Sequence, residues 1–386
     1  MKKWLTRSAW ACLLIVCAVL VIQAFVCDVY RVDSGSMEPV LHGPDGKQPG
    51  ESVLVFYGAQ ELRRFELAVL RRPGEDAPIV KRIVALPGES VLISGGDLLI
   101  DGERLACDVP RAAPITVFDS TAHPLDAAFS ELATNARDLG GAWRVEAPAG
   151  GELACGFAPR MTDGFWNASN EWVDGSELVN DLGVELAFRL LSPGATLTVE
   201  LTEDGDRFQA RVEPRTSVGV RVDVLRAQPD GSWTSLGAVE EHAGAERWHT
   251  LSFANVDNTL LASLGGDVRV FAGYTANAPL LDAPDPNLRH RLPRVALRIT
   301  GAIEFRALRV ERDRCWLRRG TQAVDVPLQL GPDEVFVLGD NSSQSFDSRE
   351  YGPVKVSDLL GRPGSVLWPR AAIRRLDGPR PWTETR

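Results

Sequence analysis

Apolar residues form one long run near the start of the chain and only short runs after it. The long run extends from Ala9 to about Cys27, and Gln23 is its only strongly polar side chain. At about 1.5 Å of helix per residue, it is just long enough to cross a bilayer core of about 30 Å, so it predicts a transmembrane anchor over residues 9–28. A cleaved signal peptide is the alternative. It is disfavoured because the run exceeds a typical signal core and its end, Cys27-Asp28-Val29-Tyr30, has no small-x-small cleavage site.

Short apolar runs separated by glycine and proline predict a mainly β body. The predicted strands cover residues 51–57, 66–70, 79–85, 90–93, 98–100 and 335–338, with hairpin turns at Gly95-Gly96-Asp97 and Asp101-Gly102. Many short strands with such punctuation indicate antiparallel β-structure with little helix. We expect this body to consist of two separated parts, residues 29–110 and 315–386.

The pattern changes near residue 108. Residues 110–160 are rich in alanine and proline with weak periodicity, and alternation returns between about 165 and 312. The predicted strands there are 186–191, 195–201, 208–212, 218–225, 248–253, 268–274, 294–299 and 303–310. They predict a β-sandwich inserted at residues 111–314. The spacing of its strands resembles that of concanavalin-like jelly rolls. The segments that support this resemblance are Arg247-Trp248-His249-Thr250-Leu251, Val256-Asp257-Asn258 and Arg309-Val310-Glu311-Arg312-Asp313. Many such sandwiches bind sugars and many bind nothing, so this likeness does not give a function.

Charge orients the chain across the membrane and disfavours nucleic acid as a partner. Lys2, Lys3 and Arg7 precede the apolar run, so the positive-inside rule predicts a cytoplasmic tail at residues 1–8 and an extracytoplasmic location for everything after Asp28. The 386 residues carry a formal net charge of -10 and include no long basic stripe of the kind that binds nucleic acid.

Histidine and cysteine positions predict no metal site. The five histidines are scattered without metal-ligand spacing. Cys12, Cys17 and Cys27 belong to the predicted anchor. Cys107 and Cys315 flank the predicted insert, and in an oxidising compartment a disulfide between them would join its two ends. Cys155 would then be an odd thiol, so the pairing stays open.

Three segments outside the insert concentrate groups capable of chemistry. They are residues 34–41, Ser-Gly-Ser-Met-Glu-Pro-Val-Leu; residues 80–89, Val-Lys-Arg-Ile-Val-Ala-Leu-Pro-Gly-Glu; and residues 339–349, Gly-Asp-Asn-Ser-Ser-Gln-Ser-Phe-Asp-Ser-Arg. The last holds four hydroxyls, two carboxylates and a guanidinium, more than a surface turn requires to satisfy its own backbone. We interpret these groups as positioning something.

In this order and behind an apolar helix, the three segments resemble the motifs of bacterial type I signal peptidases. The resemblance covers residues 1 to about 108 and about 316 to 370. It implies an antiparallel β catalytic body that cleaves secretory precursors after a small-x-small sequence, without a cofactor. By this resemblance Ser36 is the nucleophile, Lys81 the general base, Ser34 a donor to the oxyanion and Ser345 the hydroxyl that orients the lysine. Asp347 and Arg349 match a pair that supports the loop around Ser345.

The residues themselves are consistent with this chemistry. A serine hydroxyl needs a base within hydrogen-bond reach, and no histidine lies in the three segments. Lysine acts as the base in known variants of the serine triad, provided that it is neutral. Its ordinary pKa of about 10.4 falls on burial, and the apolar residues around Lys81 predict that burial.

Departures from the family pattern are mild. Residues 342–344, Ser-Ser-Gln, stand where the common pattern has Arg-Asp-Asn, and Ala85, Val40 and Glu89 replace the usual Gly, Thr and Asp. None of these positions carries a reacting group.

We therefore predict a single-pass signal peptidase of the cytoplasmic membrane with its catalytic part on the extracytoplasmic side. Its expected partners are exported preproteins and the lipid bilayer. The sequence leaves open whether the insert binds a glycan, a protein such as the translocation machinery, or the substrate. The main alternative is a membrane-tethered carbohydrate- or protein-binding module on an inactive peptidase body. The anchor and the lack of a DNA-binding helical domain argue against a third candidate, a soluble Ser–Lys self-cleaving repressor.

Overall fold

The computed structural model describes residues 10, 26–58, 61–72, 74–75, 77–105, 111–203, 205–215, 219–266, 268–276, 294–376 and 378–379. The predicted cytoplasmic tail and nearly all of the predicted anchor lie outside these residues. Within them, no helix combines the length and apolar character needed to cross a membrane. The first strand begins at Cys27, which pairs with Phe56. The last two residues of the predicted anchor, Cys27 and Asp28, therefore lie in a strand.

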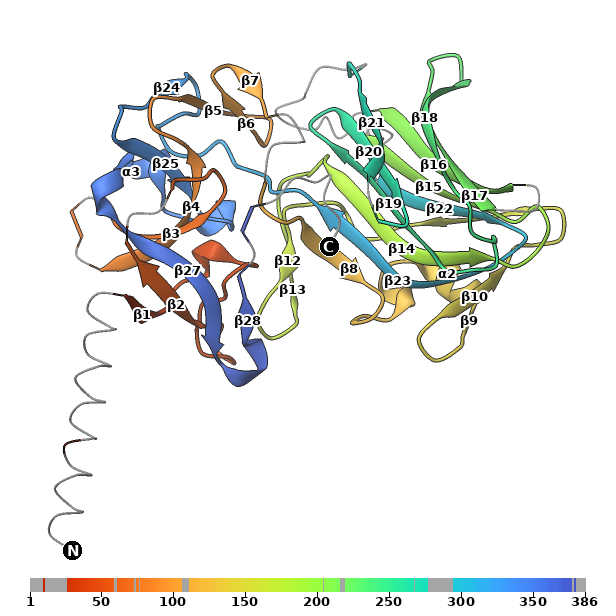
Figure 1. The fold of residues 1–386 in the computed structure, drawn as a ribbon, viewed down its shortest axis with the longest axis horizontal. Helices are drawn as coiled ribbons and strands as arrows, with labels where there is room; N and C mark the ends of the chain where they lie inside the picture. The colour runs from red at the N-terminus through yellow and green to blue at the C-terminus, as the bar shows by residue number, and fades with distance from the viewer. Residues whose placement is uncertain are drawn as a thin grey trace, which may run out of the picture.

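The described chain is mainly β with few helices, as predicted (Figure 1). One 8-stranded sheet has the order β1-β2-β27-β3-β4-β25-β26, with β28 beside β27. All of its pairings are antiparallel. The strands are β1 (Cys27–Arg31), β2 (Ser52–Tyr57), β3 (Leu67–Arg71), β4 (Pro78–Ala85), β25 (Glu334–Leu338), β26 (Val354–Lys355), β27 (Leu359–Trp368) and β28 (Arg374–Arg375).

A smaller sheet packs beside it, in the order β24-β5-β6-β7. Its strands are β5 (Ser90–Ser94), β6 (Asp97–Ile100), β7 (Glu103–Arg104) and β24 (Leu328–Gln329). The two sheets share a core that includes Val84, Val91, Ile93 and Phe336. We call these two sheets together the body, on the left of Figure 1.

The strands between residues 115 and 312, which we call the insert, lie on the right of Figure 1 and form one separate hairpin and two further large sheets. One has the order β21-β20-β19-β14-β23-β10-β9, with β8 beside β23, and the other has the order β11-β22-β15-β16-β17-β18. Their inward residues, such as Phe188, Phe253 and Phe305 from the first sheet and Val199 and Phe208 from the second, form one buried cluster. Two sheets that share one core are a sandwich.

The strands of the insert have these bounds: β8 (Ile115–Asp119), β9 (Ala136–Asp138), β10 (Trp143–Glu146), β11 (Glu152–Gly156), β14 (Leu182–Leu190), β15 (Thr196–Glu203), β16 (Asp206–Arg215), β17 (Gly219–Ala227), β18 (Trp233–Glu241), β19 (His249–Val256), β20 (Thr259–Leu264), β21 (Val268–Gly273), β22 (Arg294–Thr300) and β23 (Ala302–Arg312). A separate hairpin joins β12 (Phe165–Trp166) to β13 (Trp172–Val173). Short α-helices in the described residues include α2 (Ser130–Asn135) and, in the body, α3 (Ser348–Tyr351).

Most predicted strands are present within a few residues of their predicted ends. The elements between 110 and 160, the β12–β13 hairpin, β18 and β20 were missed in the insert, and β1, β7, β24, β26, β27 and β28 were missed in the body. β18 is an edge strand whose side chains are mostly exposed, and β20 is buried on both faces, so neither shows clear alternation.

Insert and body touch at several points. The β12–β13 hairpin reaches the loop behind the first motif, where the Ser169 hydroxyl donates to Asp45 at 2.6 Å and the Lys47 ammonium lies 2.5 Å from Glu171. Beyond β23, the Trp316 N–H donates to the Gly96 carbonyl at 2.8 Å, and its side chain is buried in the core of the body.

Candidate active site

Ser36 lies in a single 3₁₀ turn, Gly35–Met37, that follows β1. Met37 is 1% exposed and packs with Leu41, Val53 and Val55 beneath the sheet. The N–H groups of Val40 and Leu41 both donate to the Met37 carbonyl at 2.9 Å. The methionine side chain therefore anchors the turn in the core, and this fixes the backbone that carries Ser36.

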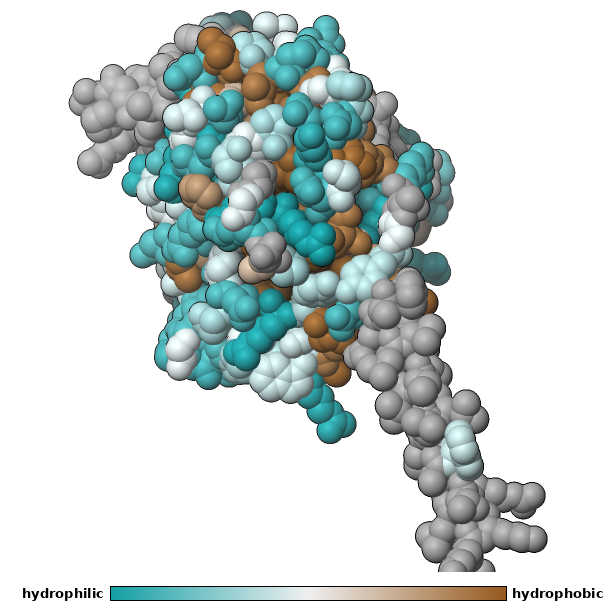
Figure 2. Space-filling model, turned by 90° about the vertical axis from the view of Figure 1, so that its left-hand side faces the viewer, coloured by the Kyte–Doolittle hydropathy of each residue, from teal (hydrophilic) through white to brown (hydrophobic). Residues whose placement is uncertain are grey.

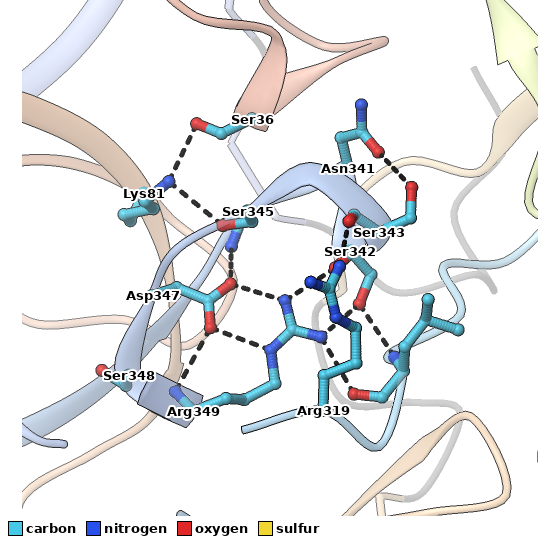
Figure 3. Close-up of polar contacts among 12 residues, drawn as sticks. Ser36, Lys81, Arg319, Asn341, Ser342, Ser343, Ser345, Asp347, Ser348 and Arg349 are labelled. Carbon is cyan, nitrogen blue, oxygen red and sulfur yellow. Dashed lines mark hydrogen bonds and ion pairs between the residues drawn. The ribbon is translucent and has the colours of Figure 1, made fainter. Parts of the chain in front are cut away.

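Lys81 projects from β4, between β3 and β25, and is only 3% exposed. Its ammonium nitrogen donates to Ser36 Oγ at 2.8 Å and to Ser345 Oγ at 3.1 Å (Figure 3). Three residues far apart in the sequence, one from each motif, thus meet at one buried amine.

Burial lowers the pKa of Lys81 from 10.5 to about 8. The neighbouring charges act in both directions: Asp347 and Asp340 raise the pKa, whereas Arg349 and Arg72 lower it. Loss of hydration prevails because the charged ammonium cannot regain it among apolar strands. An amine with a pKa of about 8 is well suited to proton transfer at physiological pH.

Ser34 lies on the exposed side of the nucleophile. Its hydroxyl donates to Ser36 Oγ at 3.3 Å, a long contact. The predicted oxyanion donor therefore borders Ser36 without being buried with it.

Asp347 and Arg349 form a buried pair beneath Ser345, with exposures of 0% and 1%. Arg349 Nε and Nη2 donate to the two carboxylate oxygens of Asp347, each at 2.8 Å (Figure 3). Burial opposes ionisation of Asp347, but hydrogen bonds and charge from Arg349, and the Ser345 hydroxyl, hold the pKa of this carboxyl below 3.8. The predicted pair is thus an ion pair next to the hydroxyl that contacts Lys81.

The third motif also contacts the nucleophile turn directly. The Asn341 N–H donates to the Ser36 carbonyl at 3.1 Å, and Asn341 Nδ2 donates to the Gly35 carbonyl at 3.1 Å. At Gly339 an added Cβ would lie 2.2 Å from Ser345 Oγ and 2.5 Å from the Ser36 carbonyl oxygen. Only glycine leaves room for this approach.

Sequence reasoning assigned no role to the ion cluster next to Lys81. Arg82 Nε lies 2.6 Å and Arg314 Nε 3.1 Å from Asp340 Oδ1, and all three residues are buried. Burial opposes the charge of Asp340, yet the two guanidinium groups hold its pKa below 3.8. Arg82 and Asp340 belong to the second and third motifs, close in sequence to Lys81 and Ser345. That position in the motifs was the sequence signal from which the ion cluster could have been predicted.

A second cluster was missed because its members are scattered in the sequence. Asp97, Asp181 and Asp257 bring carboxylate oxygens within 4.8 Å of one another where β6 faces the insert. Carboxylates in this number suit a hard cation such as Ca²⁺. However, Arg104 lies 3.1 Å from Asp97, and Arg111 pairs with Asp257, so arginines already provide positive charge. Burial and the neighbouring carboxylates raise the pKa of Asp97 to about 8.

The Cys107–Cys315 disulfide that the sequence left open is not formed in the structure, because Cys315 is a free thiol; Cys107 itself lies outside the described residues. Cys155 and Cys315 carry free thiols. Burial raises the pKa of Cys315 to about 12, so this thiol has little thiolate character near neutral pH.

A groove lies near the lysine on the same strands. Ala68, which pairs with Lys81 across β3 and β4, lines it together with Leu67, Ile83 and Leu359, and the charged residues Glu61, Glu66 and Arg362 line it as well. The site therefore combines a hydroxyl and a buried amine, a pairing suited to covalent catalysis, with a nearby groove of mixed polarity.

Comparison with known families gives a consistent match. The family model described as signal peptidase, peptidase S26, matches residues 4–131 and 306–368. Signal peptidase I of Bacillus amyloliquefaciens is 35% identical over 99 residues, which is 25% of this chain and 51% of that protein. Signal peptidase I T of Bacillus subtilis (strain 168) is 32% identical over 107 residues, 27% of this chain and 54% of that protein. The chain spans about half the length of the curated relatives it matches.

Among solved structures, a carbohydrate-binding module from Bacillus subtilis, CBM66, is similar to part of this chain. The likeness covers 46% of this chain and 90% of the module at 10% sequence identity, with a TM-score of 0.31. At that score the likeness carries no argument about what the insert does.

Proposed function

Because the chain belongs to the type I signal peptidases, we propose that it is a membrane-bound serine endopeptidase that removes signal peptides from exported precursors after a small-x-small site. The observation that carries this proposal is the 2.8 Å contact between the buried Lys81 amine and Ser36 Oγ. The alternative, a binding module on an inactive body, is disfavoured because the lysine and both serine hydroxyls lie within hydrogen-bond distance.

The first half of the reaction forms an acyl-enzyme. Neutral Lys81 accepts the proton of the Ser36 hydroxyl, and Ser36 Oγ attacks the carbonyl carbon of the small residue before the cleavage site. The Ser36 N–H and the Ser34 hydroxyl donate to the oxyanion, where one donor is typically worth about 3–4 kcal/mol. As the intermediate collapses, the C–N bond breaks and protonated Lys81 gives its proton to the leaving amine.

The second half releases the signal peptide. Lys81, again neutral, accepts a proton from water, and the hydroxide attacks the acyl carbonyl. The ester bond to Ser36 Oγ breaks, and the proton returns to that oxygen. Ser345 keeps the amine in place through both halves, and Asp347 with Arg349 keeps Ser345 in place. These steps need no cofactor.

The proposed location of the protein at the membrane rests on the sequence of the predicted anchor and on the surface of the body. Large apolar side chains are exposed on adjacent strands of the sheet: Val29 (48%), Phe56 (40%), Leu367 (40%) and Trp368 (48%). Figure 2, which faces the left-hand side of Figure 1, shows a mainly hydrophilic surface with scattered hydrophobic patches. β1 begins at Cys27, within the last two residues of the predicted anchor, so in this proposal this edge of the sheet faces the bilayer, and precursors held in the bilayer reach Ser36 there.

We retain the predicted division of the chain at residues 110 and 314, with a cytoplasmic tail, one anchor and an extracytoplasmic body. For the insert we retain a glycan or a protein, such as part of the translocation machinery, as the expected ligand class. Nucleic acid is not an expected partner.

Cleavage of defined precursors tests the proposal. The purified, detergent-solubilised protein is mixed with a precursor carrying an Ala-x-Ala site and with a matched precursor carrying Asp in place of the last Ala, and the new N-terminus is identified by mass spectrometry. We expect cleavage after the last Ala of the first precursor only. No cleavage of either, or equal cleavage of both, would contradict the proposed specificity.

A further inference from the structure

The segment that leaves the insert crosses the loop of the third motif. Residues 313–322 follow β23 without regular secondary structure. Arg314 pairs with Asp340, and Arg319 donates to the Ser343 carbonyl. The Thr321 and Gln322 N–H groups donate to the Arg349 carbonyl at 2.8 and 3.0 Å. The end of the insert is therefore fastened to the loop that carries Ser345.

Ser342 is at the centre of this crossing and is 5% exposed. Its Oγ accepts a hydrogen bond from the Leu317 N–H at 2.8 Å and another from Arg349 Nη1 at 2.6 Å. Arg349 Nη1 also donates to the Leu317 carbonyl at 2.9 Å, and Arg349 Nη2 to the Ser342 carbonyl at 2.9 Å (Figure 3). One small hydroxyl thus joins the segment leaving the insert to the guanidinium of Arg349.

From Arg349 the contacts lead to the base. Arg349 holds both carboxylate oxygens of Asp347, and Asp347 Oδ2 also accepts the Gly339 N–H at 3.0 Å. Gly339 lies against Ser345 and Ser36, and Ser345 contacts the Lys81 amine. A shift of Arg349 would therefore move the hydroxyl that orients the base.

We propose that Ser342 is a positioning residue whose hydroxyl fixes Arg349 to the segment leaving the insert and thereby holds the loop that orients Lys81. Position 342 departs from the common family pattern, which has arginine there. In this chain a small hydroxyl occupies the place, and the segment leaving the insert lies close enough to donate to it. The insert is thus tied to the catalytic loop as well as to the surface of the body. This inference rests on the proposed peptidase function.

The two possible roles of Ser342, stabilising the fold or positioning the loop, predict different outcomes when its hydroxyl is removed. If the hydroxyl only stabilised the fold, its loss would lower the melting temperature and leave kcat of the folded protein unchanged. If it positions the loop, kcat falls in the folded protein while KM for the precursor stays constant, because Ser342 is buried and offers almost no surface to a substrate.

The test compares Ser342→Ala, Ser342→Thr and Gln344→Ala in the full-length protein. Gln344 is exposed in the same 3₁₀ turn and serves as the control. We expect kcat of Ser342→Ala to fall about tenfold at constant KM, since two buried donors lose one acceptor. Ser342→Thr restores most of the rate because it retains the hydroxyl, and Gln344→Ala keeps the parent rate. An unchanged kcat in a folded Ser342→Ala protein would overturn the proposal.

A double-mutant cycle shows whether Ser342 acts through Arg349. In an Arg349→Lys background we expect Ser342→Ala to have less than a twofold further effect, because the bond it removes is already lost. Full additivity of the two effects would contradict the proposed path.

A second readout does not depend on peptidase activity. Amide hydrogen exchange within residues 339–349 should be faster in Ser342→Ala than in the parent, with Gln344→Ala unchanged. Unaltered exchange in that segment would overturn the structural coupling. If amide exchange within residues 339–349 is faster in Ser342→Ala but neither the parent nor any variant cleaves the Ala-x-Ala precursor, the proposed peptidase function fails and the structural coupling stands.

Discussion

Peptidase activity should follow the neutral form of Lys81, so the pH dependence of the rate reports its pKa directly. The perturbation is pH alone, applied to the unmodified protein. Burial lowers the pKa of this lysine from 10.5 to about 8, and only the neutral amine accepts the proton of Ser36. The rate should therefore rise with pH through a midpoint near pH 8.

The size of the effect follows from these two values. At pH 7 a lysine with a pKa of about 8 is neutral in roughly 9% of molecules, compared with roughly 0.03% at a pKa of 10.5. Burial thus increases the reactive fraction about 300-fold at pH 7. Below pH 7 the rate should fall about tenfold for each pH unit, because one proton blocks the base.

The assay is kcat/KM for an Ala-x-Ala precursor without titratable side chains near the cleavage site, measured between pH 5 and pH 10. Ser345→Ala is the companion variant, since it removes the hydroxyl that orients the amine but keeps Lys81 buried. We expect it to lower the rate at every pH without abolishing the acid limb. A profile that is flat between pH 5 and 9, or a midpoint at or above pH 10, would refute Lys81 as a buried base.

Three further predictions concern stability and the close approach at the loop. At pH 7 the free energy of unfolding of Lys81→Met should exceed that of the parent by about 3 kcal/mol, because the pKa of Lys81 is lower in the folded than in the unfolded protein. This cost of burying the charged lysine is complete below about pH 8 and absent above pH 10.5. Equal stabilities of the two proteins at pH 7 would count against burial as the cause of the lowered pKa. Asp340→Asn should destabilise the protein by about 3–5 kcal/mol in chemical denaturation, since two buried arginines lose their counter-charge, and a loss below 1 kcal/mol would show that they do not depend on it. Gly339→Ala should abolish cleavage, because its Cβ would lie 2.2 Å from Ser345 Oγ, whereas Gly156→Ala, with open space around it, should cleave normally. Normal cleavage by both glycine variants would show that the close approach at Gly339 is unimportant.

The sequence pointed to Ser36, Lys81 and Ser345 because they lie in short motifs whose spacing reflects local turns. Ser36 belongs to a tight turn anchored by Met37, and Lys81 lies on a strand of apolar residues, so both environments are encoded within about ten residues. The contacts among Ser36, Lys81 and Ser345 join residues that are far apart in the sequence. Only the family resemblance predicted that these residues would meet.

The groups that the sequence did not reveal depend on distant partners. Asp97, Asp181 and Asp257 come from the body and from two loops of the insert, so no spacing rule brings them together. Ser342 was read as a harmless departure, and its contact with Leu317 depends on how the segment leaving the insert crosses the loop. Edge strands such as β18 escaped detection because the fold, rather than local alternation, determines their burial.

The most direct test of the central claim is cleavage of the Ala-x-Ala precursor by the parent protein beside Ser36→Ala and Lys81→Ala, with the melting temperature of each protein measured in parallel. The Ser–Lys mechanism predicts cleavage after the last Ala by the parent and none by either folded variant. Cleavage by Lys81→Ala at the parent rate would contradict the mechanism, and the absence of cleavage by the folded parent would contradict the function itself.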